Sequence, residues 1–272
     1  MTRDLFFFWW HVDTAGYVAE RRIPTEDEEQ LVIIRRPSVE LGRSSYRPIR
    51  EETGLFRIFA NLDYEDSAQI TEFANSYGLL GEGVFIDPEG GQGALEGGEL
   101  FRTWAKEIDH MQRALRLWDC VQARDNESLK QYIHWEGTRS VEYQKGRTRI
   151  VIANEDSNRE YLDRFPPGDV SIPAERLVQT VINKQIDGRV SPRLLWDEGG
   201  TKLRLYLVPK NLVGAMWLQF SQAVDGNIQF LVCPECEKPF AVNKSARGKP
   251  RIYCSASCRS RAHHKRSTGG KQ

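Results

Sequence analysis

Two pairs of cysteines stand close together near the end of the 272-residue chain. Cys233-Pro-Glu-Cys236 is a C-x2-C pair, Cys254-Ser-Ala-Ser-Cys258 is a C-x3-C pair, and seventeen residues separate the two pairs. Sulfurs brought together by one tight turn or one helical turn can bind the same metal ion, and Zn²⁺ prefers four such ligands in a tetrahedron. The spacing therefore predicts one Zn²⁺ ion held by these four cysteines. Because four thiolates leave no position open for water, we expect the zinc to be structural rather than catalytic.

The residues around the cysteine pairs indicate how such a site is built. Residues 251–253 are typical of a short strand, and residues 255–266 contain no Pro or Gly and predict a helix with Ser255 as its N-cap. Knuckle, returning strand, loop, strand and helix is the order of a treble clef. A segment of about forty residues buries too little surface to fold alone, so the metal should supply the missing stability, with Phe240 and Tyr253 as a small core.

Positive charge is concentrated in the same segment. Residues 233–272 contain ten Lys or Arg and two acids, a formal +8; subtraction from the totals of 38 and 38 leaves 28 basic and 36 acidic residues, a formal −8, in residues 1–232. Lys and Arg side chains on a rigid helix are suited to phosphate contacts. We therefore predict binding to nucleic acid, DNA in preference to RNA, through Arg247, Lys249, Arg251, Arg259, Arg261, Lys265 and Arg266.

The segment resembles the treble-clef fingers of bacterial CGNR-type proteins in five features. These are Cys-Pro-x-Cys, Phe240, the basic loop, "RIYCS" (251–255) and "CRSRA" (258–262). In that family the finger follows a larger helical domain, often called ABATE, and the proteins are regarded as stress-responsive transcription regulators. The resemblance implies that the four cysteines are ligands, and it matches four residues around them, Arg251, Ser255, Arg261 and Ala262.

Two differences from the CGNR pattern affect this resemblance. The Cys-Gly-Asn-Arg signature is here Cys258-Arg259-Ser260-Arg261, and the last cysteine pair is one residue closer together. The C-S-x-x-C form is also similar to the fingers of the MYM/TRASH group, which are linked to metal sensing and protein contacts.

The resulting hypothesis is a bacterial zinc-binding transcription regulator, and two alternatives remain open. The finger could instead dock on an acidic protein partner, or the body could be an enzyme with an unrecognised site. The body contains no GxSxG, no HExxH and no glycine fingerprint after a strand, so we expect no catalytic residues. A homodimer is compatible with the hypothesis, since two fingers would double the footprint on DNA.

Residues 1–226 are expected to form a helix-weighted α+β domain with antiparallel hairpins, with a strand-rich part over residues 1–62. Hydrophobic periodicity and turn residues predict the following elements. They are strands over 5–12 and 31–37, a helix ending at Gly78, a loop over 87–98, helices over 100–124 and 128–135, a hairpin turning at Lys145-Gly146, a helix over 171–187, a hairpin over 194–208 and a helix over 210–224.

The finger itself is expected over residues 227–268, followed by a disordered tail, 269–272. The apolar run Leu5–Trp10 is too short for a signal peptide, and no stretch approaches the roughly 18–20 apolar residues that span a bilayer. We therefore expect a cytoplasmic protein that makes no membrane contact. Thiols stay reduced in the cytoplasm, which favours metal binding over disulfides.

Overall fold

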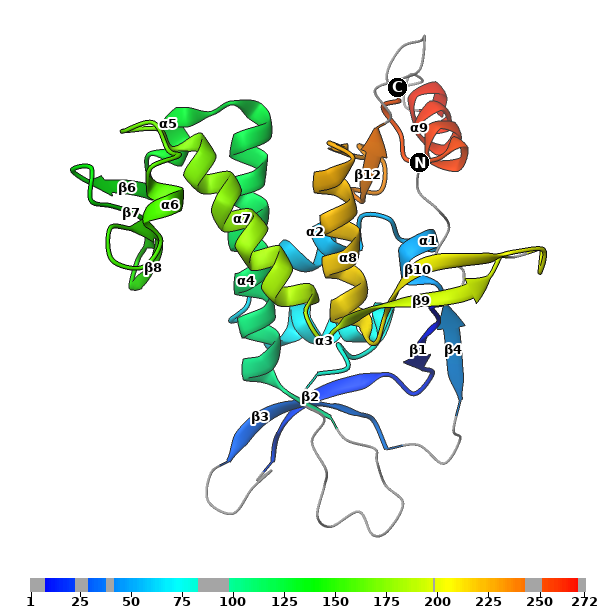
Figure 1. Ribbon diagram of the computed structural model, residues 1–272. Helices are drawn as coiled ribbons and strands as arrows, with labels where there is room; N and C mark the ends of the chain where they lie inside the picture. The colour runs from blue at the N-terminus through cyan, green and yellow to red at the C-terminus, as the bar shows by residue number, and fades with distance from the viewer. Residues whose placement is uncertain are drawn as a thin grey trace. The chain divides into compact units, whose positions relative to one another are not determined.

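A computed structural model describes residues 8–22, 29–37, 42–82, 98–197, 199–242 and 251–268 (Figure 1). These residues combine helices with several antiparallel sheets, so the predicted α+β class is confirmed. The chain divides into two compact units: unit 1 comprises Met1–Asp109 and Gly188–Gln272, and unit 2 comprises His110–Asp187. The cysteine-rich segment therefore belongs to the same unit as the N-terminal strands. The predicted boundary at residues 226 and 227 stays a prediction.

Unit 1 begins with two small antiparallel sheets. Their strands are β1 (Trp10–Asp13), β2 (Tyr17–Arg22), β3 (Gln30–Arg35), β4 (Arg43–Tyr46) and β5 (Glu99–Leu100). β1 pairs with β4, while β3 lies between β2 and β5. The strand predicted over 31–37 is confirmed, whereas the strand predicted over 5–12 begins only at Trp10 among the described residues. An ion pair between the partly buried Arg35 and the buried Asp13, with 2.6 Å between Nε and Oδ2, joins β3 to β1.

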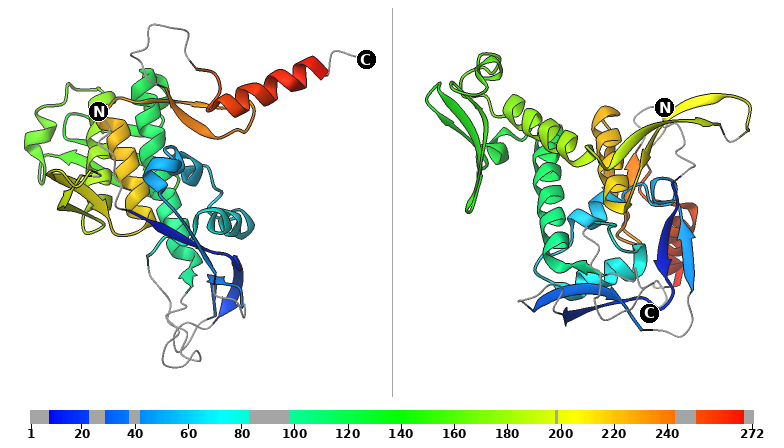
Figure 2. Two further views of the ribbon diagram at one scale, coloured as in Figure 1. Left: turned by 90° about the vertical axis from the view of Figure 1, so that its right-hand side faces the viewer. Right: turned by 60° about the horizontal axis from the view of Figure 1, so that its bottom comes forward.

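The helices of unit 1 that precede the cysteine-rich segment include α8, against which α1 and α2 pack (Figures 1 and 2). They are α1 (Pro48–Glu51), α2 (Leu55–Ala60), α3 (Ser67–Tyr77), the first part of α4 (Phe101–Ala123) and α8 (Leu212–Asp225). Every residue from Leu212 to Phe220 is buried, and a helix that is buried all round is typical of the centre of a core. The ring of Phe56 in α2 stacks on that of Phe220, with centroids 5.4 Å apart.

The long predicted helices are confirmed. α4 covers the range expected for it, and its apolar residues Trp104, Ile108 and Met111 are fully buried. α8 begins two residues after the predicted start, because the side chain of Asn211 caps it by accepting the backbone N–H of Gly214 at 2.8 Å.

Gly78 ends α3 as predicted, with a positive φ that lies outside the left-handed helical region. Its backbone has φ 89° and ψ 179°, a combination that only glycine adopts readily. A Cβ atom at this position would lie 2.5 Å from the carbonyl oxygen of His11 and 2.9 Å from Nε1 of Trp10. The glycine therefore allows the end of α3 to lie against β1.

Unit 2 contains a three-stranded antiparallel sheet and helices. Its elements after α4 are α5 (Asn126–Leu129), β6 (Ile133–Glu136), β7 (Ser140–Lys145), β8 (Thr148–Asn154), α6 (Arg159–Leu162) and α7 (Ser171–Ile186). The hairpin predicted at Lys145-Gly146 is confirmed, since Lys145 pairs with Thr148 and Gly146 has a φ of 55°. The helix predicted over 171–187 is confirmed as α7.

Two predictions for short elements are wrong. Residues 48–60, expected among the strands, form α1 and α2, and residues 133–136, expected in a helix, form strand β6. The buried residues of α2 stand at positions one, two, five and six of a six-residue helix. A run this short cannot reveal a helical period, which is why the sequence misleads here.

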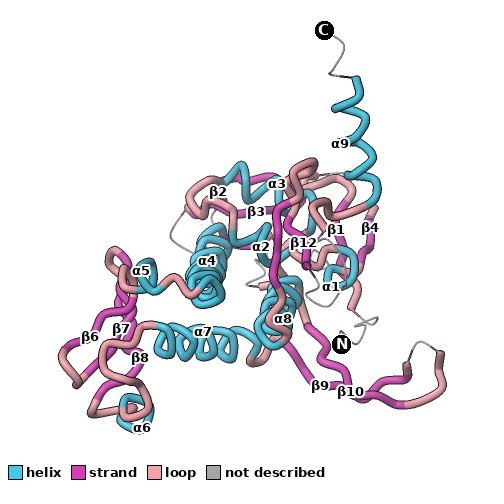
Figure 3. The backbone as a smooth tube through the Cα atoms, turned by 90° about the horizontal axis from the view of Figure 1, so that it is seen from above, coloured by secondary structure: helices cyan, strands magenta, loops and turns pink. Residues whose placement is uncertain are grey.

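The hairpin predicted over 194–208 is formed by β9 (Val190–Trp196) and β10 (Leu203–Pro209). Figures 1 and 3 show it extending away from α8. One face packs on α8, where Tyr206 and Leu218 form a buried cluster. The other face carries Leu203, Leu205 and Leu207, and all three are exposed. In the described part of the chain, no helix is both long enough and apolar enough to cross a membrane.

Candidate metal centre

The first cysteine pair lies in the turn of a hairpin made by β11 (Gln229–Val232) and β12 (Pro239–Val242). The backbone N–H of Cys233 donates to the carbonyl of Lys238 at 3.0 Å, and the N–H of Glu237 donates to the carbonyl of Cys233 at 2.8 Å. Glu237 takes a positive φ of 59°, which closes the turn. Both sulfurs of the C-x2-C pair are thus presented from one tight knuckle.

The second cysteine pair lies at the start of α9 (Ala256–Thr268). Ser255 is the N-cap, as predicted, because its hydroxyl accepts the backbone N–H of Cys258 at 3.1 Å. The strand predicted over 251–253 is wrong: residues 251–255 form an irregular segment, and no described strand pairs with it. The guanidinium of Arg251 donates instead to the carbonyl of Cys254 at 2.5 Å, which fixes the approach to the helix.

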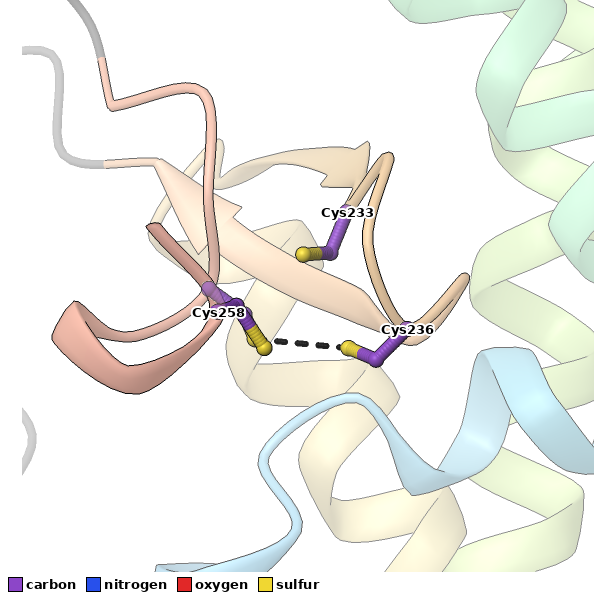
Figure 4. A group of neighbouring side chains, drawn as sticks. Cys233, Cys236 and Cys258 are labelled. Carbon is purple, nitrogen blue, oxygen red and sulfur yellow. Dashed lines mark hydrogen bonds between the residues drawn. The ribbon is translucent and has the colours of Figure 1, made fainter. Parts of the chain in front are cut away.

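The four cysteine sulfurs lie within 4.8 Å of one another and could hold a metal ion. Sγ of Cys254 is 3.5 Å from Sγ of Cys236 and 3.5 Å from Sγ of Cys258. All four thiols are free, since a disulfide requires a separation of about 2.05 Å. Ligands at about 2.3 Å from a tetrahedral zinc would be about 3.8 Å apart, so this spacing fits a four-thiolate site. Figure 4 shows the sulfurs of Cys233, Cys236 and Cys258 turned toward one another.

A small core surrounds the sulfurs. Cys233 and Cys258 are buried together with Phe240, and Tyr253 packs against this cluster. Phe240 and Tyr253 thus pack beside the cysteines, as predicted for the core of the segment. Three buried side chains are few for a module of this size, which leaves most of its stability to be supplied by metal binding.

Hydrogen bonds around two of the sulfurs favour the thiolate form. The Ser255 hydroxyl and the Arg261 guanidinium hold the pKa of Cys258 below its usual value. Burial opposes ionisation of Cys233, but backbone N–H groups around the knuckle lower its pKa to about 6. These donors suit a metal site, because thiolates rather than thiols are the ligands.

A charged network around the sulfurs was not foreseen from the sequence. The guanidinium of Arg261 donates to Sγ of Cys258 at 3.1 Å. Glu235 lies within the knuckle, and its side chain is only 8% exposed. Its carboxylate forms an ion pair with Lys265 at 2.8 Å and lies 4.0 Å from Nε of Arg261. The partners of Glu235 are 26 and 30 positions further along the chain, so no local spacing in the sequence could have indicated these pairs.

The predicted phosphate-contacting residues therefore differ in their surroundings. Arg247 and Lys249 lie outside the described residues. Arg259 is exposed, and its side chain makes no hydrogen bond or ion pair with any residue that the structure describes. Arg266 is exposed and donates to the carbonyl of Ala262. His263 and His264 are exposed on α9 and are not part of the cysteine group.

The knuckle hairpin is attached to α1 and α2 of the same unit. The ring of Phe230 in β11 meets that of Phe56 edge-on at 5.2 Å, and the guanidinium of Arg57 lies 4.9 Å from the centre of the Phe230 ring. Nζ of Lys238 forms an ion pair with Glu52 at 3.1 Å. Helix α9, by contrast, extends away from the hairpin (Figures 2 and 3).

A second polar cluster, in the body of unit 1, was also missed. Arg189 binds the carboxylate of Glu107 through two nitrogens, at 2.9 and 3.2 Å, and binds Glu82 at 2.8 Å. The amide of Asn211 donates to the same Glu82 oxygen at 2.8 Å. Each charge in the cluster is paired with an opposite charge. The cluster therefore links Glu82, which precedes α4, to Asn211 at the start of α8, and it presents no reactive group.

Glu99 lies beside this cluster and is fully buried. Its carboxylate accepts backbone N–H groups from three consecutive residues, at 2.9 Å from Leu80, 2.5 Å from Gly81 and 3.0 Å from Glu82. Burial nevertheless raises the pKa of Glu99 to about 7. This carboxyl therefore titrates near neutral pH within the core.

Comparison with known proteins adds no relative to this description. No protein-family model matches the chain, and no match was found among curated proteins. The function must therefore be argued from the site itself.

Proposed function

We propose that residues 227–268 form a treble-clef-type module that binds one structural Zn²⁺ ion through Cys233, Cys236, Cys254 and Cys258. The observation that carries this proposal is the grouping of the four sulfurs within 4.8 Å of one another. Bound zinc would neutralise half of the charge of the four thiolates and tie the knuckle to the start of α9. Structural zinc contributes on the order of 10 kcal/mol in small fingers, which is enough to fold a module with so small a core.

Zinc is favoured over other metals by the ligand set. Four thiolates in a tetrahedral arrangement suit Zn²⁺ or an iron–sulfur centre, and paired knuckle cysteines are typical of structural zinc. Elemental analysis of the purified protein should find one zinc per chain and no stoichiometric iron. An iron-containing, coloured protein would identify the other centre, and a metal-free protein with ordered α9 would refute the proposal.

We further propose that the module contacts nucleic-acid phosphates through α9, as part of a transcription regulator. Arg259, His263 and Arg266 stand at i, i+4 and i+7 and share one helix face, and all three are exposed. The resemblance to CGNR-type fingers supports a DNA ligand. The zinc-loaded protein should bind duplex DNA with an affinity that falls as salt rises, and a Cys236→Ser variant should lose that binding.

A second candidate function is protein binding, and the module's exposed apolar residues favour it. Leu231, Val232 and Ile252 are 45%, 66% and 64% exposed, although each is apolar. Because Glu235 already neutralises part of the charge on α9, fewer cations remain for phosphate. Under this alternative the zinc-loaded protein would bind no DNA at low salt, and Val232→Asp would release a co-purifying protein while Arg259→Ala would not.

A further inference from the structure

The β9–β10 hairpin exposes a continuous apolar face. The register pairs Trp196 with Leu203, Leu194 with Leu205 and Pro192 with Leu207, so these six side chains alternate onto one side of the two strands. All six are exposed, and none carries a charge. An antiparallel sheet with one solvated face normally carries polar residues on that face. This hairpin instead resembles a sheet with a second layer missing.

The opposite face already has its partner. Tyr206 is buried against Leu218 of α8, with Ile49, Leu195 and Val208 packed around them. The hairpin is therefore held in place by α8 through its buried face. The exposed face is not needed to complete this core.

The size of the exposed face matches a protein interface. Leu194 and Leu205 are 62% and 64% exposed, Trp196 is 57% exposed, and Leu203 and Leu207 are about half exposed. With about 200 Å² for a fully exposed leucine and somewhat more for tryptophan, these five side chains present roughly 600 Å² of surface, at the upper end of what a monomer shows in one patch. Two such faces would bury roughly 1,200 Å², the lower limit for a specific interface.

We infer that this face, formed by residues 192–196 and 203–207, is a homodimer interface and that its occupant is the same face of a second copy. An apolar, uncharged surface offers nothing to select a charged partner, but it can pack against the same surface of a second copy. The two-fold axis would lie in the plane of the interface, near the central Leu194–Leu205 pair and perpendicular to the strands. It would place Trp196 of one copy over Pro192 and Leu207 of the other. The bulky indole then meets the smallest side chain of the face, and the two hairpins form a four-stranded sandwich.

The inference goes beyond the proposed metal and DNA binding and depends on neither. The experiment is sedimentation velocity on the full-length protein from low to high micromolar concentration, with Leu205→Glu as the test variant. Ile172→Glu on α7 is the matched control, because Ile172 is 41% exposed and lies away from the hairpin in sequence. We expect wild type and Ile172→Glu to dimerise, and Leu205→Glu, which places an unpaired carboxylate at the centre of the interface, to weaken dimerisation at least about 100-fold.

A wild-type protein that stays monomeric throughout, or a dimer that Leu205→Glu leaves intact, would overturn the inference. Should Leu205→Glu fail to fold, as judged by circular dichroism, hydroxyl-radical footprinting of the wild type decides the question. Oxidation of Trp196 should fall several-fold as the protein is concentrated, while Trp9, which is 50% exposed outside the hairpin, should react equally at every concentration. Equal reactivity of Trp196 at all concentrations would also overturn it.

Discussion

Helix α9 offers a matched pair of substitutions that tests the DNA-binding proposal. Arg259→Ala and Lys265→Ala each remove one positive charge from an exposed position on the same helix. Arg259 has no side-chain partner among the described residues, whereas Lys265 pairs with Glu235 at 2.8 Å. A phosphate contact by Lys265 would have to displace this pairing. The two variants should therefore differ although their net charges are the same.

The magnitude follows from counterion release. Each phosphate contact contributes about −0.9 to the slope of log K against log salt on duplex DNA, which is about a 3.5-fold loss in affinity when salt rises from 50 to 200 mM. Contacts by Arg251, Arg259 and Arg266 would give a wild-type slope of about −2.7 and a loss of about 40-fold over that range. Arg259→Ala should reduce the slope to about −1.8 and the loss to about 12-fold, while Lys265→Ala should stay close to wild type.

The assay is fluorescence anisotropy of a labelled duplex titrated with zinc-loaded protein at several salt concentrations. Zinc content and helical circular dichroism must match between the variants, so that a change in slope reports on contacts and not on folding. Equal slopes for the two variants would refute the division of α9 into paired and unpaired cations. A wild-type slope near zero would refute phosphate contact altogether.

Three further predictions concern the metal, the core and the attachment of the module. Cys236→Ser should weaken zinc binding by more than about 100-fold in a chelator competition, because it removes one of four ligands. Burial raises the pKa of Glu99 to about 7 from 4.5, so the folded state holds this proton more tightly than the unfolded state. The free energy of unfolding should therefore fall by on the order of 3 kcal/mol as pH rises from 4.5 to 7. Glu99→Gln should remove this contribution to the pH dependence, measured by urea unfolding. Phe230→Ala should lower the free energy of unfolding by about 2 kcal/mol in the same assay while zinc content stays at the wild-type level, because it removes the contacts with Phe56 and Arg57.

The parts of the structure that the sequence predicts are those specified by local spacing. The knuckle, the Ser255 cap and the long helices α4, α7 and α8 each depend on residues within a few turns of one another. α2 and β6 are too short to show a period, and tertiary packing decides their conformation. The polar cluster around Arg189 joins residues up to 129 positions apart and has no local signature.

The β9–β10 hairpin shows a different limit of sequence analysis. The alternation of Leu203, Leu205 and Leu207 predicts that they share a face, and they do. The alternate positions, however, include Tyr206 and Val208, which are apolar as well, so the pattern does not say which face is buried. The core under α8 accommodates Tyr206, and the leucines are left on the outside.

The formal charge of the cysteine-rich segment overestimates the number of positive side chains that are available to contact phosphate. The formal +8 of residues 233–272 falls to about +6 once four thiolates and one Zn²⁺ are included. Glu235 then engages Lys265 and Arg261, and Arg261 is further committed to Sγ of Cys258. Removing this carboxylate with Glu235→Gln should therefore have two effects: stronger DNA binding with a steeper salt slope, because two cations are released, and weaker zinc binding, because Arg261 is no longer held beside the thiolate. If one arginine supports the metal in this way, metal affinity and DNA affinity should change in opposite directions in this variant, a result that a uniformly basic helix would not give.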